Sequence, residues 1–470
     1  MEPINTYQPL VAVIGGGISG LATAFCLQQT GMKVLILEKE ATVGGTMKTV
    51  FEDGYLIDKG PNSALDTTPL IRKLLTDIGI PDEQVYANPA ADNRYVLRNG
   101  TLYPLPMSPL KFFKSRLFST RAKFRLFLEP FIAPSRNEKE ESVADFVIRR
   151  LGQEFLDYAI NPFIAGVYAG NPRELSIRHA VPKVFALEQK YGSLIKGQIR
   201  GIRERKKRAE TSKHTARLFS FYNGMQTFTN ALGQVLKDSI VTNATVTSID
   251  PIEKSKKHNV SYIHEGKSLQ TPVDAVFLAI PSYDAAEYIQ PHSFDLARML
   301  REIPYAPAAV VFFGARKDQC THPLDGFGFL VPEVEKRRIL GTIWSSSIFP
   351  NRASDGHVAL TTFVGGTRQP EMVDYDDARL ITIVKEELGE LIGFQGDPAH
   401  TNISRWNRAI PQYVLGYGKM LTELEKFEKE HPGFFIGGNF RDGIGIGDCI
   451  KNAYEMATVI SEQLTVNSDQ

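Results

Sequence analysis

A glycine-rich segment near the start of the chain has the spacing of a nucleotide-binding turn. Residues Gly15, Gly16, Gly17, Ile18, Ser19 and Gly20 form the pattern GxGxxG. In this pattern the first glycine permits a tight turn, the second lets the backbone approach a pyrophosphate, and the third lets a helix pack closely on a strand. Phosphates then bind at the N-terminus of that helix, where N–H groups are free. The segment predicts a dinucleotide site.

The flanking residues predict the strands and helix that this turn needs. An unbroken apolar run at 10–14 is typical of a buried parallel strand, and 21–27 continue as a helix that Gly31 ends. A second strand, 34–37, stops at Glu38, roughly 18 residues after Gly20. A carboxylate at that distance accepts hydrogen bonds from the adenosine ribose and repels a 2′-phosphate. NADP is therefore disfavoured, while FAD and NAD both fit.

A second glycine pair distinguishes between these two cofactors. Val43-Gly44-Gly45-Thr46 directly follows the second predicted strand. Flavoproteins of this class use glycines there to let the chain pass close to the cofactor, although the arginine that usually accompanies the motif is absent. The pattern favours FAD.

Composition limits the remaining possibilities. The chain has 470 residues, with 54 Lys and Arg against 53 Asp and Glu, so a globally basic nucleic-acid binder is excluded as the default interpretation. Hydrophobic residues make up 43% and charged residues 23%, as in ordinary globular proteins. Three scattered cysteines predict neither a disulfide scaffold nor a CxxC metal site, and no metal cluster or Ser/His/Asp set is evident.

Motifs further along the chain are recognisable together. They include 60–63, 93–100, 161–172, 187–197, 222–227, 361–367 and 437–449. With these motifs the chain resembles the protoporphyrinogen oxidase family, a branch of the flavin amine oxidases, over nearly its whole length.

The resemblance implies an α/β fold, α+β overall, with a Rossmann-type FAD-binding domain that is discontinuous in sequence. This domain would comprise 8–90, 215–282 and 430–465, with a helical membrane-binding domain at 91–214 and a substrate-binding domain at 283–429. The residues agree independently with the last FAD segment, since 434–438 read as a short strand ending in glycines and 448–463 as a helix. Its N-terminus would stabilise negative charge on the reduced flavin.

The resemblance also assigns cofactor contacts beyond the glycine turn. We expect them at Glu38, Lys39, Thr46, Gly60, Pro61, Asn62, Ser63, Val246, Trp406, Asn439, Ile444, Gly445 and Ile446. Val246 would act through its backbone, within a stretch at 239–249 whose β-branched residues and alternation predict strand.

The substrate implied by the resemblance is a porphyrinogen, a large apolar macrocycle that carries carboxylates. Arg94 would bind a propionate, because guanidinium and carboxylate form two parallel hydrogen bonds. The other expected contacts are Ala169, Gly170, Leu330, Ile343 and Phe363, which the pattern alone assigns to the core. No side-chain base is identified, which fits hydride transfer to FAD.

The implied reaction is the oxidation of protoporphyrinogen IX by dioxygen, with hydrogen peroxide as product, in haem biosynthesis. Three alternatives stay open: oxidation of coproporphyrinogen III, which differs in propionate number, a flavin amine oxidase, and a flavin-binding membrane scaffold without turnover.

A cationic, aromatic stretch at 110–127 suits an anionic membrane surface, or a solvated helix with its phenylalanines packed inward. A second basic stretch, 200–217, is expected to be a solvated loop, and nucleic acid is not expected as a partner. No run approaches the roughly 20 apolar residues that span a bilayer, and no leader or transit peptide is evident. We expect a bacterial cytoplasmic protein bound peripherally to the inner face of the cell membrane, with a ferrochelatase neighbour and a homodimer as further expectations.

Overall fold

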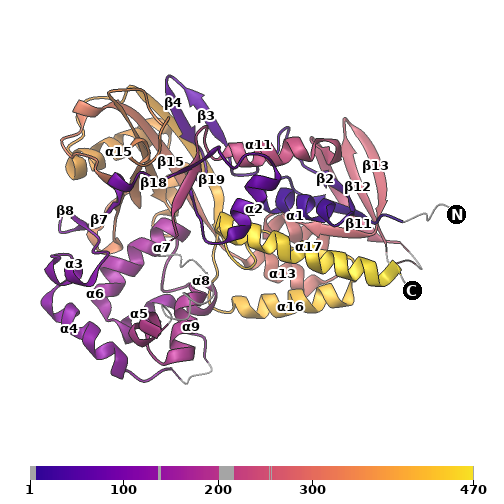
Figure 1. The fold of residues 1–470 in the computed structure, drawn as a ribbon, viewed down its shortest axis with the longest axis horizontal. Helices are drawn as coiled ribbons and strands as arrows, with labels where there is room; N and C mark the ends of the chain where they lie inside the picture. Colours follow the sequence, from indigo (N-terminus) through magenta and orange to yellow (C-terminus); the bar gives the residue numbers. More distant parts are fainter. Residues whose placement is uncertain (1–6, 136–138, 201–215, 253–254, 256, 469–470) are drawn as a thin grey trace.

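The structure is a computed structural model that describes residues 7–135, 139–200, 216–252, 255 and 257–468. Most of the basic stretch predicted to be a solvated loop, 201–215, lies outside these residues. In Figure 1 the two ends of the chain lie on the same side of the molecule, opposite the helices α3 to α6.

A parallel five-stranded sheet organises one part of the described chain, in the order β10-β2-β1-β14-β20. The strands are β1 (Leu10–Ile14), β2 (Lys33–Leu37), β10 (Ile240–Val241), β14 (Ala275–Leu278) and β20 (Phe434–Ile436). The predicted strands at 10–14 and 34–37 are confirmed, and they pair in parallel. Their unbroken apolar sequences follow from burial on both faces of the sheet.

Helices cover both faces of this sheet. Val11 and Val13 pack into one core with α1 (Ile18–Gln29), α2 (Pro69–Asp77), α11 (Gln226–Val235) and α17 (Ile446–Ser468). The alternate residues, Ala12 and Ile14, pack into the opposite core with α12 (Ser282–Ile289), α13 (Phe294–Glu302) and α16 (Tyr417–Glu430). Figure 1 shows α1 and α17 running alongside each other. The result is a three-layer α/β arrangement, in agreement with the Rossmann-type fold that the resemblance implies.

Two predicted elements have different bounds. The stretch at 239–249, predicted to suit strands, forms two of them in different sheets: β10 ends at Val241, and β11 (Ala244–Pro251) begins another sheet with β12 (His258–His264) and β13 (Lys267–Val273). Asn243 lies between them at a φ of 51°, a left-handed conformation that breaks an extended chain. The final helix is longer than 448–463 and begins two residues earlier, at Ile446.

A seven-stranded mixed sheet forms the second large layer, in the order β19-β15-β18-β17-β16-β7-β8. Its strands are β7 (Asn93–Arg98), β8 (Thr101–Pro104), β15 (Tyr305–Arg316), β16 (Gly326–Leu330), β17 (Gly341–Trp344), β18 (His357–Gly365) and β19 (His400–Pro411). One face packs on α15 (Asp377–Ile392) through a core that includes Val311, Phe313 and Leu388.

Smaller elements complete the described chain. Two small sheets hold β3 (Thr49–Glu52) with β4 (Tyr55–Asp58), and β9 (Leu218–Phe221) between β5 (Ala64–Leu65) and β6 (Gln84–Tyr86). A group of helices, purple in Figure 1, contains α3 (Pro109–Lys114), α4 (Thr120–Leu128), α5 (Val143–Arg150), α6 (Gln153–Phe155), α7 (Asn161–Tyr168), α8 (Ile177–Ala180) and α9 (Pro182–Tyr191). The short α14 (Ser345–Ile348) follows β17.

The cationic stretch forms α3 and α4 and divides its aromatic side chains. Phe112 and Phe118 pack inward, each stacking on Phe155. The exposed apolar side chains are Leu110, Phe113, Phe124, Phe127, Leu128 and Phe131, of which Phe131 is 85% exposed. Within the described ranges, no helix is both long enough and apolar enough to cross a bilayer.

Candidate active site

The glycine-rich turn lies between β1 and α1, at the carboxyl ends of the parallel strands. In the sheet, β1 has β2 as its neighbour on one side and β14 on the other. The turn that follows β1 therefore lies at a switch point of the sheet. Gly15 has a φ of 106°, which favours glycine, and a Cβ on Gly20 would lie 2.0 Å from the Gly15 carbonyl oxygen. In contrast, a Cβ on Gly17 would meet no atom within 4 Å. The turn therefore leaves open space at its central glycine.

The N-terminus of α1 is not capped by a side chain. Gly17 is its N-cap, no side chain caps it, and its first turn carries no acid. The positive end of the helix and its free N–H groups can therefore accept phosphate charge.

Glu38 lies beside this turn and is largely buried, with 7% of its surface exposed. Its Oε2 accepts a hydrogen bond from the Gly16 N–H at 2.6 Å, and its Oε1 accepts one from the Glu40 N–H at 2.8 Å. Each carboxylate oxygen keeps a lone pair for a ribose hydroxyl. The Glu38 carboxylate, which follows β2, thus lies where the sequence predicts it.

Two further loops lie in succession beside the turn. The Gly44 N–H donates to the Gly16 carbonyl at 2.8 Å, and a Cβ on Gly45 would lie 3.3 Å from the Gly17 Cα. A Cβ on Gly60 would in turn lie 2.1 Å from the Thr46 carbonyl oxygen. The second glycine pair therefore lies against the turn, and the 60–63 motif lies against the second glycine pair.

The carboxyl-terminal motif also reaches this place through α17. The side chains of Cys449 in α17 and Ser19 in α1 interact, so the N-termini of the two helices lie together. Ile446 begins α17, and Asn439, Ile444 and Gly445 lie in the loop that precedes it. The N-terminus of a second helix, which carries Asp448 in its first turn, is thereby directed at the same region.

The remaining predicted cofactor residues are placed less closely. Lys39 forms an exposed ion pair with Asp284 at 3.6 Å. Ser63 donates to the Asn62 side chain at 3.0 Å, next to Pro61 in the same loop. Val246 lies in β11, and its carbonyl accepts a hydrogen bond from the Tyr288 hydroxyl at 3.0 Å. Their roles at the cofactor stay predictions.

Trp406 connects the cofactor loops to the seven-stranded sheet. Its indole Nε1 donates to the Lys59 carbonyl at 2.8 Å, directly before Gly60. Trp406 pairs with Ala308 across β19 and β15, and Val310 pairs with Phe363 across β15 and β18. Ala308 and Val310 are two residues apart, so Trp406 and Phe363 project from one face of the sheet.

The predicted substrate residues share that face. Gly341 lies opposite both Phe363 and Leu330. Gly328 lies opposite both Ile343 and Arg94. Leu330 is two residues from Gly328 along β16, and Ile343 is two residues from Gly341 along β17. Because side chains two residues apart point to the same face of a strand, all four side chains lie on one side of the sheet. Because the glycines carry no side chain, the face is flat between the larger residues. Leu330, Ile343 and Phe363 are half-buried, and Arg94 is exposed.

The end of α7 lies against this face. A Cβ on Gly166 would come within 2.8 Å of Leu330, and the Ala169 carbonyl accepts a hydrogen bond from the Thr367 N–H at 2.8 Å, just beyond β18. Ala169 ends α7 at a φ of 47°, and a Cβ on Gly170 would lie 2.3 Å from the Gln412 side chain. The tight stretch predicted at 169–170 thus borders the wall that carries Leu330 and Phe363.

Sequence reasoning missed two polar residues near these positions, the half-buried Arg368 and the buried Tyr413. Arg368 donates to the Val331 carbonyl at 2.6 Å and to the Asn161 side chain at 2.7 Å, and burial lowers its pKa to about 10. Tyr413 is 2% exposed and bonds to the loop that precedes α17. Neither belongs to a recognisable spacing, because both bind backbone or side-chain groups that are distant in sequence.

The residues present fit FAD. The open space at Gly17 provides room for a pyrophosphate, and the uncapped start of α1 provides its counter-charge. The buried Glu38 carboxylate provides an acceptor for the ribose hydroxyls. The start of α17 at Ile446 provides a second helix N-terminus for the flavin. Within the described residues no group of three or more His, Cys, Asp or Glu could hold a metal ion.

The comparisons agree with this assignment. Residues 18–461 match the family of flavin containing amine oxidoreductases, and the chain belongs to that family, with FAD as its cofactor. Two solved structures share the fold. An Exiguobacterium sp. 255-15 protein has a TM-score of 0.81 at 23% identity, covering 97% of this chain and 99% of its own. Cyclohexylamine oxidase from Brevibacterium oxydans has a TM-score of 0.68 at 17% identity, covering 98% and 100%.

Two sequence relatives are named for the oxidation of porphyrinogens. The chain is 34% identical to protoporphyrinogen oxidase 2, chloroplastic/mitochondrial, of Arabidopsis thaliana, over 97% of this chain and 94% of the relative. It is 28% identical to the coproporphyrinogen III oxidase of Bacillus subtilis (strain 168), over 97% and 98%. The resemblance to protoporphyrinogen oxidases inferred from the motifs is confirmed.

Proposed function

We propose that this protein oxidises protoporphyrinogen IX to protoporphyrin IX in haem biosynthesis, with dioxygen as acceptor and hydrogen peroxide as product. The observation that carries the proposal is the shared sheet face, on which one exposed arginine, Arg94, accompanies half-buried apolar side chains beside the FAD-binding loops. The names of the full-length relatives support it.

Arg94 suits a propionate because its guanidinium is available. It lies 5.7 Å from the centre of the Phe327 ring, and no carboxylate of the described residues forms an ion pair with it. A carboxylate could therefore bind to two of its N–H groups without displacing a protein partner. Arg98, on the same strand, is already paired with Glu154 and is not available in this way.

Leu330, Ile343 and Phe363 would hold the macrocycle by apolar contact and keep water from its reacting carbon. Bound FAD supplies the hydride acceptor. None of the residues assigned to the substrate, Arg94, Leu330, Ile343 and Phe363, is a base, so the proposal gives the chain a role in binding, orientation and electrostatics rather than in proton abstraction by a side chain.

The test is aerobic turnover of the FAD-loaded protein on protoporphyrinogen IX and, separately, on coproporphyrinogen III. Porphyrin fluorescence is followed and corrected for spontaneous oxidation, while oxygen uptake and peroxide are measured in parallel. A higher kcat/KM on protoporphyrinogen IX is expected. Preference for coproporphyrinogen III would move the proposal to the reaction of the Bacillus relative, and no enzymatic rate on either would overturn it.

We also propose that the exposed surface of α3 and α4 binds an anionic membrane peripherally. The apolar side chains exposed there lie among exposed bases at Lys111, Lys114, Arg116 and Arg121. This arrangement lets aromatic rings enter the headgroup region while the bases contact lipid phosphates.

Replacing these four bases by serine should reduce sedimentation with vesicles that contain anionic lipid and should not affect binding to neutral vesicles. A matched control removes four exposed lysines elsewhere: Lys237, Lys267, Lys429 and Lys451. Equal loss in both variants would show a general charge effect and contradict the proposal.

A further inference from the structure

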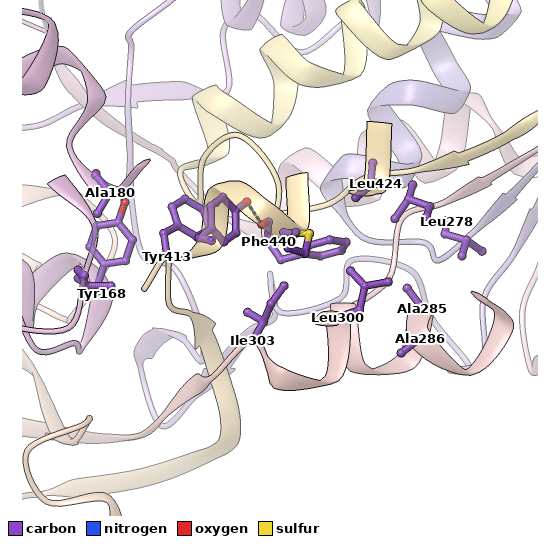
Figure 2. Packing of buried hydrophobic residues seen from close by; sticks show 14 of the residues in the cluster. Tyr168, Ala180, Leu278, Ala285, Ala286, Leu300, Ile303, Tyr413, Leu424 and Phe440 are labelled. Atoms are coloured by element: carbon purple, nitrogen blue, oxygen red, sulfur yellow. Dashed lines mark hydrogen bonds between the residues drawn. The ribbon is translucent and has the colours of Figure 1, made fainter. Parts of the chain in front are cut away.

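A cluster of three buried tyrosines lies between the turn at Ala169 and the loop that leads into α17. The Tyr413 ring lies 6.0 Å from Tyr168, edge to face, and 4.7 Å from Tyr417, stacked. Figure 2 shows Tyr413 between Tyr168 on one side and Phe440 on the other. Of the three, Tyr413 is the one that contacts both neighbours.

The Tyr413 hydroxyl makes two hydrogen bonds to the loop 439–443. It donates to the Asn439 carbonyl at 2.6 Å and accepts from the Gly443 N–H at 3.0 Å. Tyr417 donates to the next carbonyl along, that of Phe440. Burial raises the pKa of the Tyr413 phenol well above its ordinary value, so the hydroxyl keeps its proton and remains a donor.

The backbone around Tyr413 is fixed on the opposite side. Its carbonyl accepts a hydrogen bond from the Ser176 N–H at 2.8 Å, and the adjacent Gln412 side chain donates to the Tyr168 carbonyl, also at 2.8 Å. Ala169, the residue after Tyr168, borders the wall that carries Leu330 and Phe363. One short segment, 412–413, therefore holds both this turn and the loop 439–443.

We propose that Tyr413 is a positioning residue that fixes the loop 439–443, and with it the N-terminus of α17, relative to the bound FAD. The loop continues directly into α17 at Ile446, and a helix N-terminus held in one orientation stabilises negative charge more than one that fluctuates. The inference depends on the FAD assignment and not on the proposed porphyrinogen reaction.

The test compares Tyr413→Phe with a matched control, Tyr168→Phe. The Tyr168 hydroxyl donates to the Ala180 carbonyl at 2.9 Å, so its loss removes a buried hydrogen bond in the same cluster without touching the loop 439–443. For both FAD-loaded variants we would measure the flavin midpoint potential by equilibration with a reference dye, the visible absorption spectrum of the bound flavin, and the unfolding temperature. Porphyrinogen is not needed for any of these measurements.

Tyr413→Phe is expected to shift the midpoint potential to more negative values and to change the flavin spectrum, because the reduced, negatively charged flavin loses stabilisation. Tyr168→Phe is expected to lower the unfolding temperature while keeping the potential and spectrum of the unmodified protein. An unchanged potential and spectrum in Tyr413→Phe would overturn the inference, as would an equal shift in Tyr168→Phe.

If Tyr413→Phe does not fold, Tyr417→Phe provides the deciding measurement, since its hydroxyl bonds to the neighbouring carbonyl of the same loop. A smaller shift of the potential in the same direction is then expected, and no shift would overturn the inference.

Discussion

The glycines of the phosphate-binding turn serve two separate purposes at the residue scale. Gly20 is required by the protein itself, because a Cβ there would lie 2.0 Å from the Gly15 carbonyl oxygen. Gly17 is not required by the protein itself, because a Cβ there would meet open space and any residue can adopt its φ of −76°. The open space beside Gly17 is where we expect the cofactor to lie.

Replacing each of these glycines by alanine should separate folding from cofactor binding. Gly17→Ala is expected to lower the free energy of unfolding of the apoprotein by only about 1 kcal/mol, the cost of alanine at an N-cap, yet to weaken FAD binding at least about tenfold. Gly20→Ala is expected to prevent stable folding because it forces backbone apart. FAD titration and thermal unfolding of the apoprotein measure the two effects, and tight FAD binding by Gly17→Ala would contradict the assignment.

Arg94 should act on substrate binding more than on the chemical step. Arg94→Ala removes a charge-assisted hydrogen-bond pair worth about 1.5–3 kcal/mol, which predicts roughly a 10- to 150-fold higher KM for a porphyrinogen with little change in kcat. Steady-state turnover measures both constants. Arg316→Ala, an exposed arginine on β15 of the same sheet, is the control and should leave both near their original values. A fall in kcat alone for Arg94→Ala would exclude the binding role.

At the scale of elements, strand register collects the proposed substrate residues on one face. β7, β16, β17 and β18 come from distant parts of the chain, yet glycines at 328 and 341 lie between the larger side chains in the paired strands. A register shift of one residue would send every one of these side chains to the opposite face, toward α15. Correct pairing of these strands is therefore a condition for the site.

His258, where β12 meets the chain that leads into β20, predicts that the protein is less stable in acid. Burial lowers the pKa of His258; the backbone contact of its Nε2 with the Pro432 carbonyl opposes this, and nearby His292 and His431 lower the pKa further. Its Nδ1 is buried without a hydrogen-bond partner in the described chain, so a proton there would have no acceptor.

Because the folded pKa lies below the ordinary value of 6.5, the stability that neutral His258 provides is present above that pH and is lost as the pH falls below it. Unfolding temperatures measured from pH 8 to pH 5 should fall in the acid range, and His258→Phe should flatten this dependence. Parallel curves for the two proteins would show that another group is responsible.

At the scale of the whole molecule, the expected FAD site is assembled from segments far apart in sequence. The turn at 15–20, the loops at 44–46 and 60–63, and the start of α17 at Ile446 come together only when both ends of the chain are folded. Trp406 adds a contact from the second sheet. Cofactor binding is therefore linked to the folding of the entire chain.

Added FAD should accordingly raise the temperature of the main unfolding transition rather than of a partial one. At a free FAD concentration 100 times its Kd, the expected gain in unfolding free energy is about 2.7 kcal/mol. Calorimetry of the apoprotein with increasing FAD tests this, with adenosine monophosphate as a control ligand that lacks the flavin. A transition that stays fixed with FAD while a minor one moves would show that the site unfolds independently.

The sequence by itself determined the local part of the cofactor site. The strands at 10–14 and 34–37, the helix between them and the placement of Glu38 follow from apolar runs, glycine spacing and a terminal acid, all of which depend on neighbouring residues. The break at Asn243 was not predicted, because β-branched residues continue on both sides of it and give no signal for a change of sheet.

Only the tertiary structure decided which distant residues lie together. Leu330, Ile343 and Phe363 have the pattern of ordinary core residues, and only strand pairing places them on one face with Arg94. Tyr413 carries no sequence signal at all, since its partners are backbone groups at Asn439 and Gly443. Backbone donors and acceptors are the same for nearly every residue type, so contacts made through them are fixed by the path of the chain and leave no trace in composition or spacing.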